Sequence, residues 1–132
     1  MKIKKIIPIL LLITIAGCGG KPNVKGKVVF SDDKTPVKQG IVIFENEKGI
    51  ARGQIDENGT YTIGSEKATD GLQAGTYKVY LAGTEIFDSS GGFPKMEYVV
   101  DRKYDKPETS GLTVEVKKSR TYDLEIDRYK KK

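Results

Sequence analysis

The sequence predicts an all-β protein whose architecture is a seven-stranded antiparallel β-sandwich, with a barrel as the alternative. No stretch of ten residues keeps the 3.6-residue apolar period of a helix. Instead, short runs rich in Val, Ile, Tyr and Phe are separated by turn residues at regular spacing. The 132 residues suffice for one domain of this kind and leave no room for a second full core.

The first 17 residues are predicted to be a cleaved signal peptide. Three lysines precede an apolar run over residues 6–16, which is too short to cross a bilayer as a helix. Small residues end this run directly before Cys18, the single cysteine of the chain. One cysteine alone excludes an intramolecular disulfide and a CxxC site.

The segment Ile15-Ala16-Gly17-Cys18 resembles the lipobox of bacterial lipoproteins. The resemblance implies cleavage before Cys18, diacylglycerol on its thiol and an acyl chain such as palmitate on the new amine. Two or three acyl chains anchor a protein durably. The alternative is an incidental thiol after an ordinary signal peptide or N-terminal anchor. Because Gly19 follows, the resemblance places the protein on the outer membrane if its host has two membranes.

Residues 18–23 are predicted to be the lipidated cysteine and a flexible tether, and residues 24–127 the sandwich. Alternation within the strands indicates one buried and one solvated face, as in antiparallel sheets. Connection 83–110 is long for a loop, and a short extra strand is expected at residues 97–100. The seven predicted strands are residues 24–31, 40–46, 50–56, 60–64, 75–82, 112–116 and 122–126.

Four stretches, read in order, resemble transthyretin-like (carboxypeptidase regulatory-like) domains. Residues 35–44 resemble the opening "pv-x-x-G-x-V-x-F", and residues 53–63 the hairpin "G-x-x-D-x-x-G-x-Y-x-I". Residues 72–79 resemble the strand entry "L-x-x-G-x-Y-x-V". Residues 103–113 resemble "K-Y-x-x-P-x-T-S-G-L", a segment of small lipoproteins of this type. The resemblance implies a prealbumin-like or Ig-like sandwich in a mostly non-enzymatic family of accessory, adhesion and folding modules.

Six residues of these motifs are expected to specify the fold. Asp56 should accept hydrogen bonds from turn amides, and Gly59 should supply a positive φ. The ring of Tyr61 should enter the core, and the hydroxyl of Tyr77 should bond to nearby backbone, as in a tyrosine corner. The six are Asp56, Asn58, Gly59, Tyr61, Gly75 and Tyr77.

Catalysis, metal and cofactors are not expected, apart from the covalent lipid on Cys18. The chain has no His, which removes Ser-His-Asp and Cys-His nucleophiles and His-ligated metals. A calcium loop at residues 56–59 would lack its further acidic ligands. Asp101, Asp105 and Glu108 alternate with basic residues, so a charge-balanced loop is favoured over an oxygen site. The enzymatic alternative is a small hydrolase that uses acids such as Asp101 and Asp105 alone.

A ligand surface is predicted on the long connection, at Phe87, Phe93, Tyr98 and Tyr104. Aromatic side chains on an exposed loop suit contact with an envelope protein or a glycan. The alternative is that these rings fold back over an open end of the sandwich. A third function is assembly into a larger envelope structure through an exposed strand edge.

The net charge of +5 does not indicate nucleic-acid binding. The signal peptide removes three lysines, and the basic tail over residues 128–132 holds four more cations. Residues 18–127 retain 16 basic and 18 acidic residues, a net charge of −2. The tail is expected either to contact anionic lipid headgroups or acidic envelope polymers, or to be a free terminus. The sequence thus predicts a lipid-anchored protein of the bacterial envelope.

Overall fold

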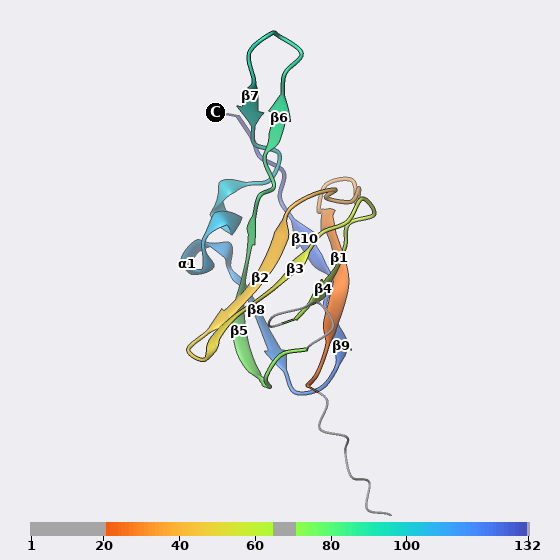
Figure 1. Ribbon diagram of the computed structural model, residues 1–132, viewed down its shortest axis with the longest axis vertical. Coiled ribbons are helices and arrows are strands. Elements are labelled where there is room, and N and C mark those ends of the chain that lie inside the picture. Colours follow the sequence, from red (N-terminus) through yellow and green to blue (C-terminus); the bar gives the residue numbers. More distant parts are fainter. Residues whose placement is uncertain (1–20, 65–70, 132) are drawn as a thin grey trace, which may run out of the picture.

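The computed structural model describes residues 21–64 and 71–131. The predicted signal peptide and Cys18 lie outside this part of the chain. Two four-stranded sheets face each other, so the prediction of an all-β sandwich is confirmed (Figure 1). The first sheet contains β1 (Val24–Phe30), β4 (Thr60–Ile63), β9 (Arg120–Thr121) and β10 (Leu124–Ile126). The second contains β2 (Ile41–Asn46), β3 (Gly49–Gln54), β5 (Gly75–Ala82) and β8 (Leu112–Val116).

The second sheet, in the order β3-β2-β5-β8, is antiparallel throughout, but the first sheet is mixed. β1 pairs antiparallel with β4 and parallel with both β9 and β10. The cause is the short turn at residues 117–119, which carries the chain from β8 across to the other sheet. The last strands therefore run in the direction of β1, which differs from the fully antiparallel prediction.

The strand predicted at residues 122–126 is interrupted where it crosses Gly26. A Cβ atom at Gly26 would collide with the carbonyl group of Tyr122. The backbone N–H of Lys27 donates to the carboxylate of Asp123 at 2.9 Å, and the hydroxyl of Tyr61 donates to the carbonyl oxygen of Tyr122. Side chains thus replace the ladder bonds that are lost where β9 ends and β10 begins.

The core fills the space between the two sheets. Its aromatic centre is Phe44, whose ring lies 5.8 Å from that of Tyr77 and 6.2 Å from that of Tyr122, centre to centre. Burial of large side chains such as these is the main stabilising contribution. The fully buried aliphatic residues are Val24, Val28, Val42, Ile63, Leu72, Val79, Leu81, Val116, Leu124 and Ile126.

The turn at residues 56–59 is a structural turn. One carboxylate oxygen of Asp56 accepts the backbone N–H groups of Asn58 and Thr60, each at 2.9 Å. Gly59 has φ +80°, and a Cβ atom there would lie 2.8 Å from Pro36. Only glycine meets both conditions.

Two buried tyrosines donate their hydroxyl groups to backbone carbonyl oxygens. Tyr61 is 1% exposed, and burial raises the pKa of its hydroxyl. Tyr77 is buried near the start of β5, which begins at Gly75, and its hydroxyl donates to the carbonyl oxygen of Gln73, four residues upstream. Burial also raises the pKa of Tyr77. Both rings therefore pack as apolar groups while their hydroxyls satisfy backbone carbonyls.

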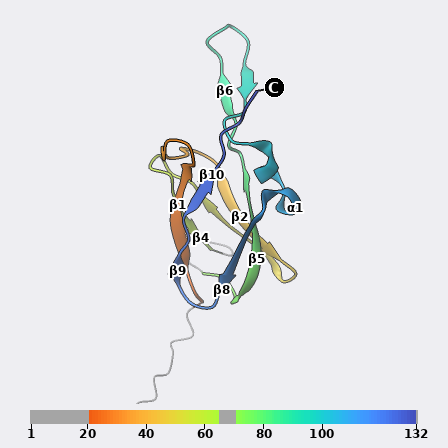
Figure 2. The ribbon, with the colours of Figure 1, turned by 180° about the vertical axis from the view of Figure 1, so that it is seen from behind.

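The long connection after β5 is an ordered projection. It contains a two-stranded antiparallel sheet of β6 (Ile86–Asp88) and β7 (Lys95–Glu97), a 3₁₀ turn (Arg102–Asp105) and the short helix α1 (Pro107–Ser110). Figures 1 and 2 show the β6–β7 hairpin rising from one end of the sandwich, with the C-terminal residues beside it. β1 begins at the opposite end.

Candidate functional site

The β6–β7 hairpin, residues 86–97, concentrates the exposed apolar surface of the described chain. Its exposed fractions are 42% for Ile86, 72% for Phe87, 86% for Phe93 and 47% for Met96. Elsewhere among the described residues, the large hydrophobic side chains at the surface are Ile50 and Tyr129 alone. Clustered exposed apolar groups mark contact sites more often than scattered ones do.

The strand register of the hairpin separates its side chains into two faces. Phe87 lies directly opposite Met96, so the two side chains share one face. Asp88 lies opposite Lys95, and Ile86 lies opposite Glu97, on the other face. The hairpin is therefore amphipathic, with an apolar face and a face of mixed charge.

The hairpin tip is a defined turn. The carboxylate of Asp88 accepts the backbone N–H of Ser90 at 2.9 Å. Hydrogen bonding from the Ser90 side chain, and then from its backbone N–H, lowers the pKa of Asp88. The N–H of Gly92 donates to the carbonyl oxygen of Ser89 at 3.2 Å, and Gly92 has φ +89°. Phe93 follows directly and stands in solvent.

The outgoing limb of the hairpin is fixed where β5 ends. Gly83, at φ +65°, turns the chain toward the hairpin, and the next residue, Thr84, is 4% exposed. Thr84 packs against Gly40, where a Cβ atom would lie 2.8 Å from the Thr84 methyl group. The side chain of Gln39 donates to the carbonyl oxygen of Glu85.

The return limb is held by the C-terminal residues of the chain. Val100 is buried in the core and forms an antiparallel bridge with Arg128. The N–H of Tyr129 donates to the carbonyl oxygen of Val99 at 2.9 Å. The N–H of Asp101 donates to Asp127 at 3.0 Å. Residues 127–129 thus brace the hairpin.

Arg128 fastens this brace to the sandwich. Its guanidinium lies 3.8 Å from the ring centre of Phe30 and within 3.0 and 3.2 Å of the carboxylates of Asp32 and Asp33. The pKa of Asp33 is lowered, mainly by the hydrogen bonds that Thr35 donates and to a smaller extent by the charge of Arg128. The predicted basic tail is therefore docked at its first two residues, and its described remainder, Lys130 and Lys131, is exposed.

The four aromatic residues predicted to form the ligand surface are in different environments. Phe87 and Phe93 are exposed on the hairpin, but Tyr104 is 4% exposed. The hydroxyl of Tyr104 accepts the backbone N–H of Asp127 at 3.1 Å. Tyr104 is thus excluded from the surface, because its ring packs in the core and its oxygen satisfies a distant amide.

Tyr98 is half-buried at the base of the hairpin. Its ring lies between the ring of Tyr129, 5.4 Å away, and the guanidinium of Arg102, 4.6 Å away. Tyr98 thus supports the brace. Met96 shares the face of Phe87, and Ile86 is exposed on the opposite face of the hairpin. The exposure of Ile86 and Met96 could have been predicted only from alternation of apolar and polar residues within β6 and β7. Three residues per strand are too few to show the two-residue period of a strand.

The acidic residues of the long connection serve local structure. Asp101 accepts the N–H of Lys103 at 2.9 Å and begins the 3₁₀ turn. Asp105 pairs with Arg102 at 3.2 Å. In the part of the chain that the structure describes, no three Cys, Asp or Glu side chains converge on a site for a metal ion.

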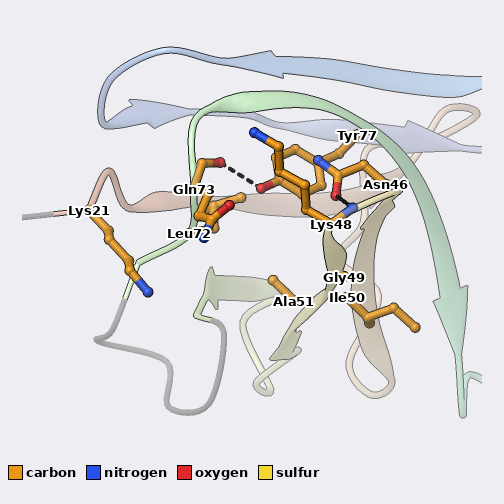
Figure 3. Close-up of a pocket in the computed structure, with 9 residues that line it drawn as sticks. All are labelled: Lys21, Asn46, Lys48, Gly49, Ile50, Ala51, Leu72, Gln73 and Tyr77. Carbon is orange, nitrogen blue, oxygen red and sulfur yellow. Dashed lines mark hydrogen bonds between the residues drawn. The ribbon is translucent and has the colours of Figure 1, made fainter.

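A shallow pocket lies at the other end of the sandwich, where β1 begins (Figure 3). Leu72, Ala51 and Tyr77 form its apolar lining, and Lys21 and Lys48 stand at its edge. The backbone N–H of Lys48 donates to the Asn46 side chain, and the Tyr77 hydroxyl to Gln73, so these polar groups are already satisfied. Sequence reasoning did not anticipate this pocket.

Comparison with known proteins supports the fold. The crystal structure of a form of BcpA, the major pilin subunit of Bacillus cereus, superposes with a TM-score of 0.51 and 15% sequence identity. The match covers 83% of this chain but 30% of the pilin chain, so this chain spans less than a third of that protein. No family model and no curated protein matches the sequence. Among residues 21–64 and 71–131, none of the helices has the length and apolar character to cross a membrane. At this identity, the chain shares the β-sandwich fold of the pilin subunit.

Proposed function

We propose that this chain is a lipid-anchored protein of the bacterial envelope that presents the β6–β7 hairpin to another envelope protein. The observation that carries the proposal is the position of the hairpin. Its apolar face projects from one end of the sandwich, and the chain leaves for Cys18 from the other end (Figure 1). An anchor at Cys18 would therefore leave the hairpin free to reach a partner.

A protein partner fits the hairpin better than a glycan does. The exposed side chains are flexible or aromatic apolar groups, and Phe87 and Met96 form an apolar cross-strand pair. Protein interfaces are enriched in Phe and Met. The strand edges of β6 and β7 also offer backbone groups for strand addition, which suits assembly with a second β protein. The transthyretin-like resemblance agrees with such an accessory, non-catalytic role.

The anchor is tested by the mass of the mature protein. We expect the protein from cell membranes to begin at Cys18 and to carry diacylglycerol and a further acyl chain. Cys18→Ser should abolish the lipid and release the protein from the membrane, and Gly20→Ser, two residues away, should change neither. A Cys18→Ser protein that stays fully bound without lipid would contradict the anchor.

The hairpin is tested by site-specific photo-crosslinking of the full-length protein in the cells that produce it. A photoreactive residue at Phe93 should yield a discrete protein adduct, and one at Arg52, exposed on β3, should not. Phe87→Ser with Met96→Ser should remove the Phe93 adduct without lowering the melting temperature, because both side chains already face solvent. A Phe93 adduct that persists in this double variant, or the absence of any adduct, would reject the proposal. An adduct with a glycan polymer would replace the protein partner with the glycan one.

A further inference from the structure

The end of the sandwich where β1 begins carries a cluster of cations. Three segments meet there: residues 21–23, the β2–β3 turn at residues 47–48 and the β8–β9 turn at residues 117–120 (Figures 1 and 2). We call this surface the cationic end. Its exposed cations are Lys21, Lys48, Lys117, Lys118 and Arg120.

Few carboxylates balance these charges within the described residues. The same segments and their flanks contribute Glu45, Glu47 and Glu115. Glu115 pairs with Lys117 at 3.5 Å, but both side chains are more than half exposed, so the pair is weak. Across residues 21–64 and 71–131, the other four cations have no carboxylate within 4 Å.

The cationic end is held by short-range bonds. The N–H of Asn23 donates to the hydroxyl of Ser119 at 2.9 Å, and the N–H of Arg120 donates to the carbonyl oxygen of Asn23 at 3.0 Å. The guanidinium of Arg120 donates to the carbonyl oxygen of Glu115 at 3.0 Å. These hydrogen bonds join the start of β1 to the β8–β9 turn, so their cations lie on one surface.

The length of the tether brings this end to a membrane. β1 begins six residues after Cys18, and a fully extended chain of that length reaches about 20 Å. A flexible chain averages about 13 Å. Electrostatic attraction is screened over a distance of about 8 Å at physiological ionic strength. A lipidated Cys18 would therefore hold the cationic end at a distance from the headgroups that is comparable with this screening length.

We propose that the cationic end rests on anionic phospholipid headgroups and sets the sandwich upright, with the hairpin pointing away from the bilayer. This proposal rests on the proposed anchor at Cys18 for its biological setting, but the lipid contact is a property of the folded surface alone. The occupant is a lipid surface because the chain that leaves this end carries the predicted lipid three residues before Lys21.

The test uses the mature chain, residues 18–132, with Cys18→Ser, so that binding does not depend on the lipid. It is floated with vesicles of equal parts phosphatidylglycerol and phosphatidylcholine, and with phosphatidylcholine alone. We expect binding to the anionic vesicles at 20 mM salt, loss of that binding at 200 mM salt, and no binding to the neutral vesicles. The triple variant Lys48→Gln, Lys117→Gln, Lys118→Gln should bind the anionic vesicles at least about tenfold more weakly than the parent does.

The matched control removes the same charge from the hairpin end. Lys38→Gln, Lys130→Gln, Lys131→Gln should bind as the parent does, because these exposed lysines lie outside the cationic end. Equal loss in both triple variants would show attraction by net charge and overturn the proposal. Binding that salt does not weaken, or that 10 mM glycerol phosphate removes at constant ionic strength, would also overturn it. The mass of the wild-type protein tests the anchor separately.

Discussion

The two ends of the sandwich are built differently. The hairpin end exposes apolar side chains on a projection that depends on the C-terminal residues, and some of its charges are paired, as at Arg128 with Asp32 and Asp33. The cationic end is a set of short turns with few carboxylate partners among the described residues. One end is suited to a neutral partner and the other to an anionic surface. Under the two proposals, one small sandwich would separate anchoring at one end from recognition at the other.

The largest effect on the free energy of unfolding is expected in β1, the strand that runs between the two ends. Gly26→Val should destabilise the whole sandwich by about 3 kcal/mol or more, because its side chain would collide with the backbone of Tyr122. Gly91→Ala, at the hairpin tip, has open space around it and should stay within about 0.5 kcal/mol. Urea denaturation of both variants measures this. Similar midpoints for the two would show that β1 does not join the ends as described.

A smaller effect is expected at the brace. Arg128→Ala should loosen the brace, because the contact with Phe30 and the ion pair with Asp32 are lost. Amide hydrogen exchange should accelerate over residues 86–101 and stay unchanged over residues 117–121. Lys130→Ala is the control, since its side chain is exposed and its removal should change neither region. Uniform acceleration would mean that the hairpin and the sandwich open together.

The smallest effect is expected from acid. Lys103 and then Ser31 lower the pKa of Asp127, and hydrogen bonds from Thr35 and the charge of Arg128 lower that of Asp33. A carboxyl whose folded pKa is depressed stabilises the fold above its unfolded pKa of about 3.9, and that stability is lost as pH falls through the folded value. Amide hydrogen exchange, corrected for intrinsic rates, should therefore show that the brace loosens below about pH 4. The cationic end should loosen only at a lower pH. Loosening of both ends at one pH would contradict this.

The sandwich was predictable because five of its eight strands, β1, β2, β3, β5 and β8, alternate over five or more residues. In β5 the apolar side chains of Tyr77, Val79 and Leu81 all face the core, as the pattern indicated. Alternation reports which face is buried, but it does not report the direction of the neighbouring strand. The parallel pairing of β10 with β1 was therefore missed, and so was the break at Tyr122, which depends on Gly26 from the far end of the chain.

The candidate site was predictable in part. Phe87 and Phe93 were identified because large aromatic residues in a Gly- and Ser-rich segment have little local structure to cover them. Tyr104 was misassigned because its burial depends on the backbone N–H of Asp127, 23 residues away. The brace was also missed, since nothing local indicates that Arg128 contacts Phe30 and Asp32.

The mixed sheet also determines how the molecule carries a mechanical load. If the protein is pulled between its anchor and a partner on the hairpin, force enters at the start of β1 and leaves near the end of β5. β1 is then drawn lengthwise past β4 on one side and past β9 and β10 on the other. Its hydrogen bonds share the force in shear and do not open one at a time. Such a strand arrangement resists extension along the axis that joins the two ends.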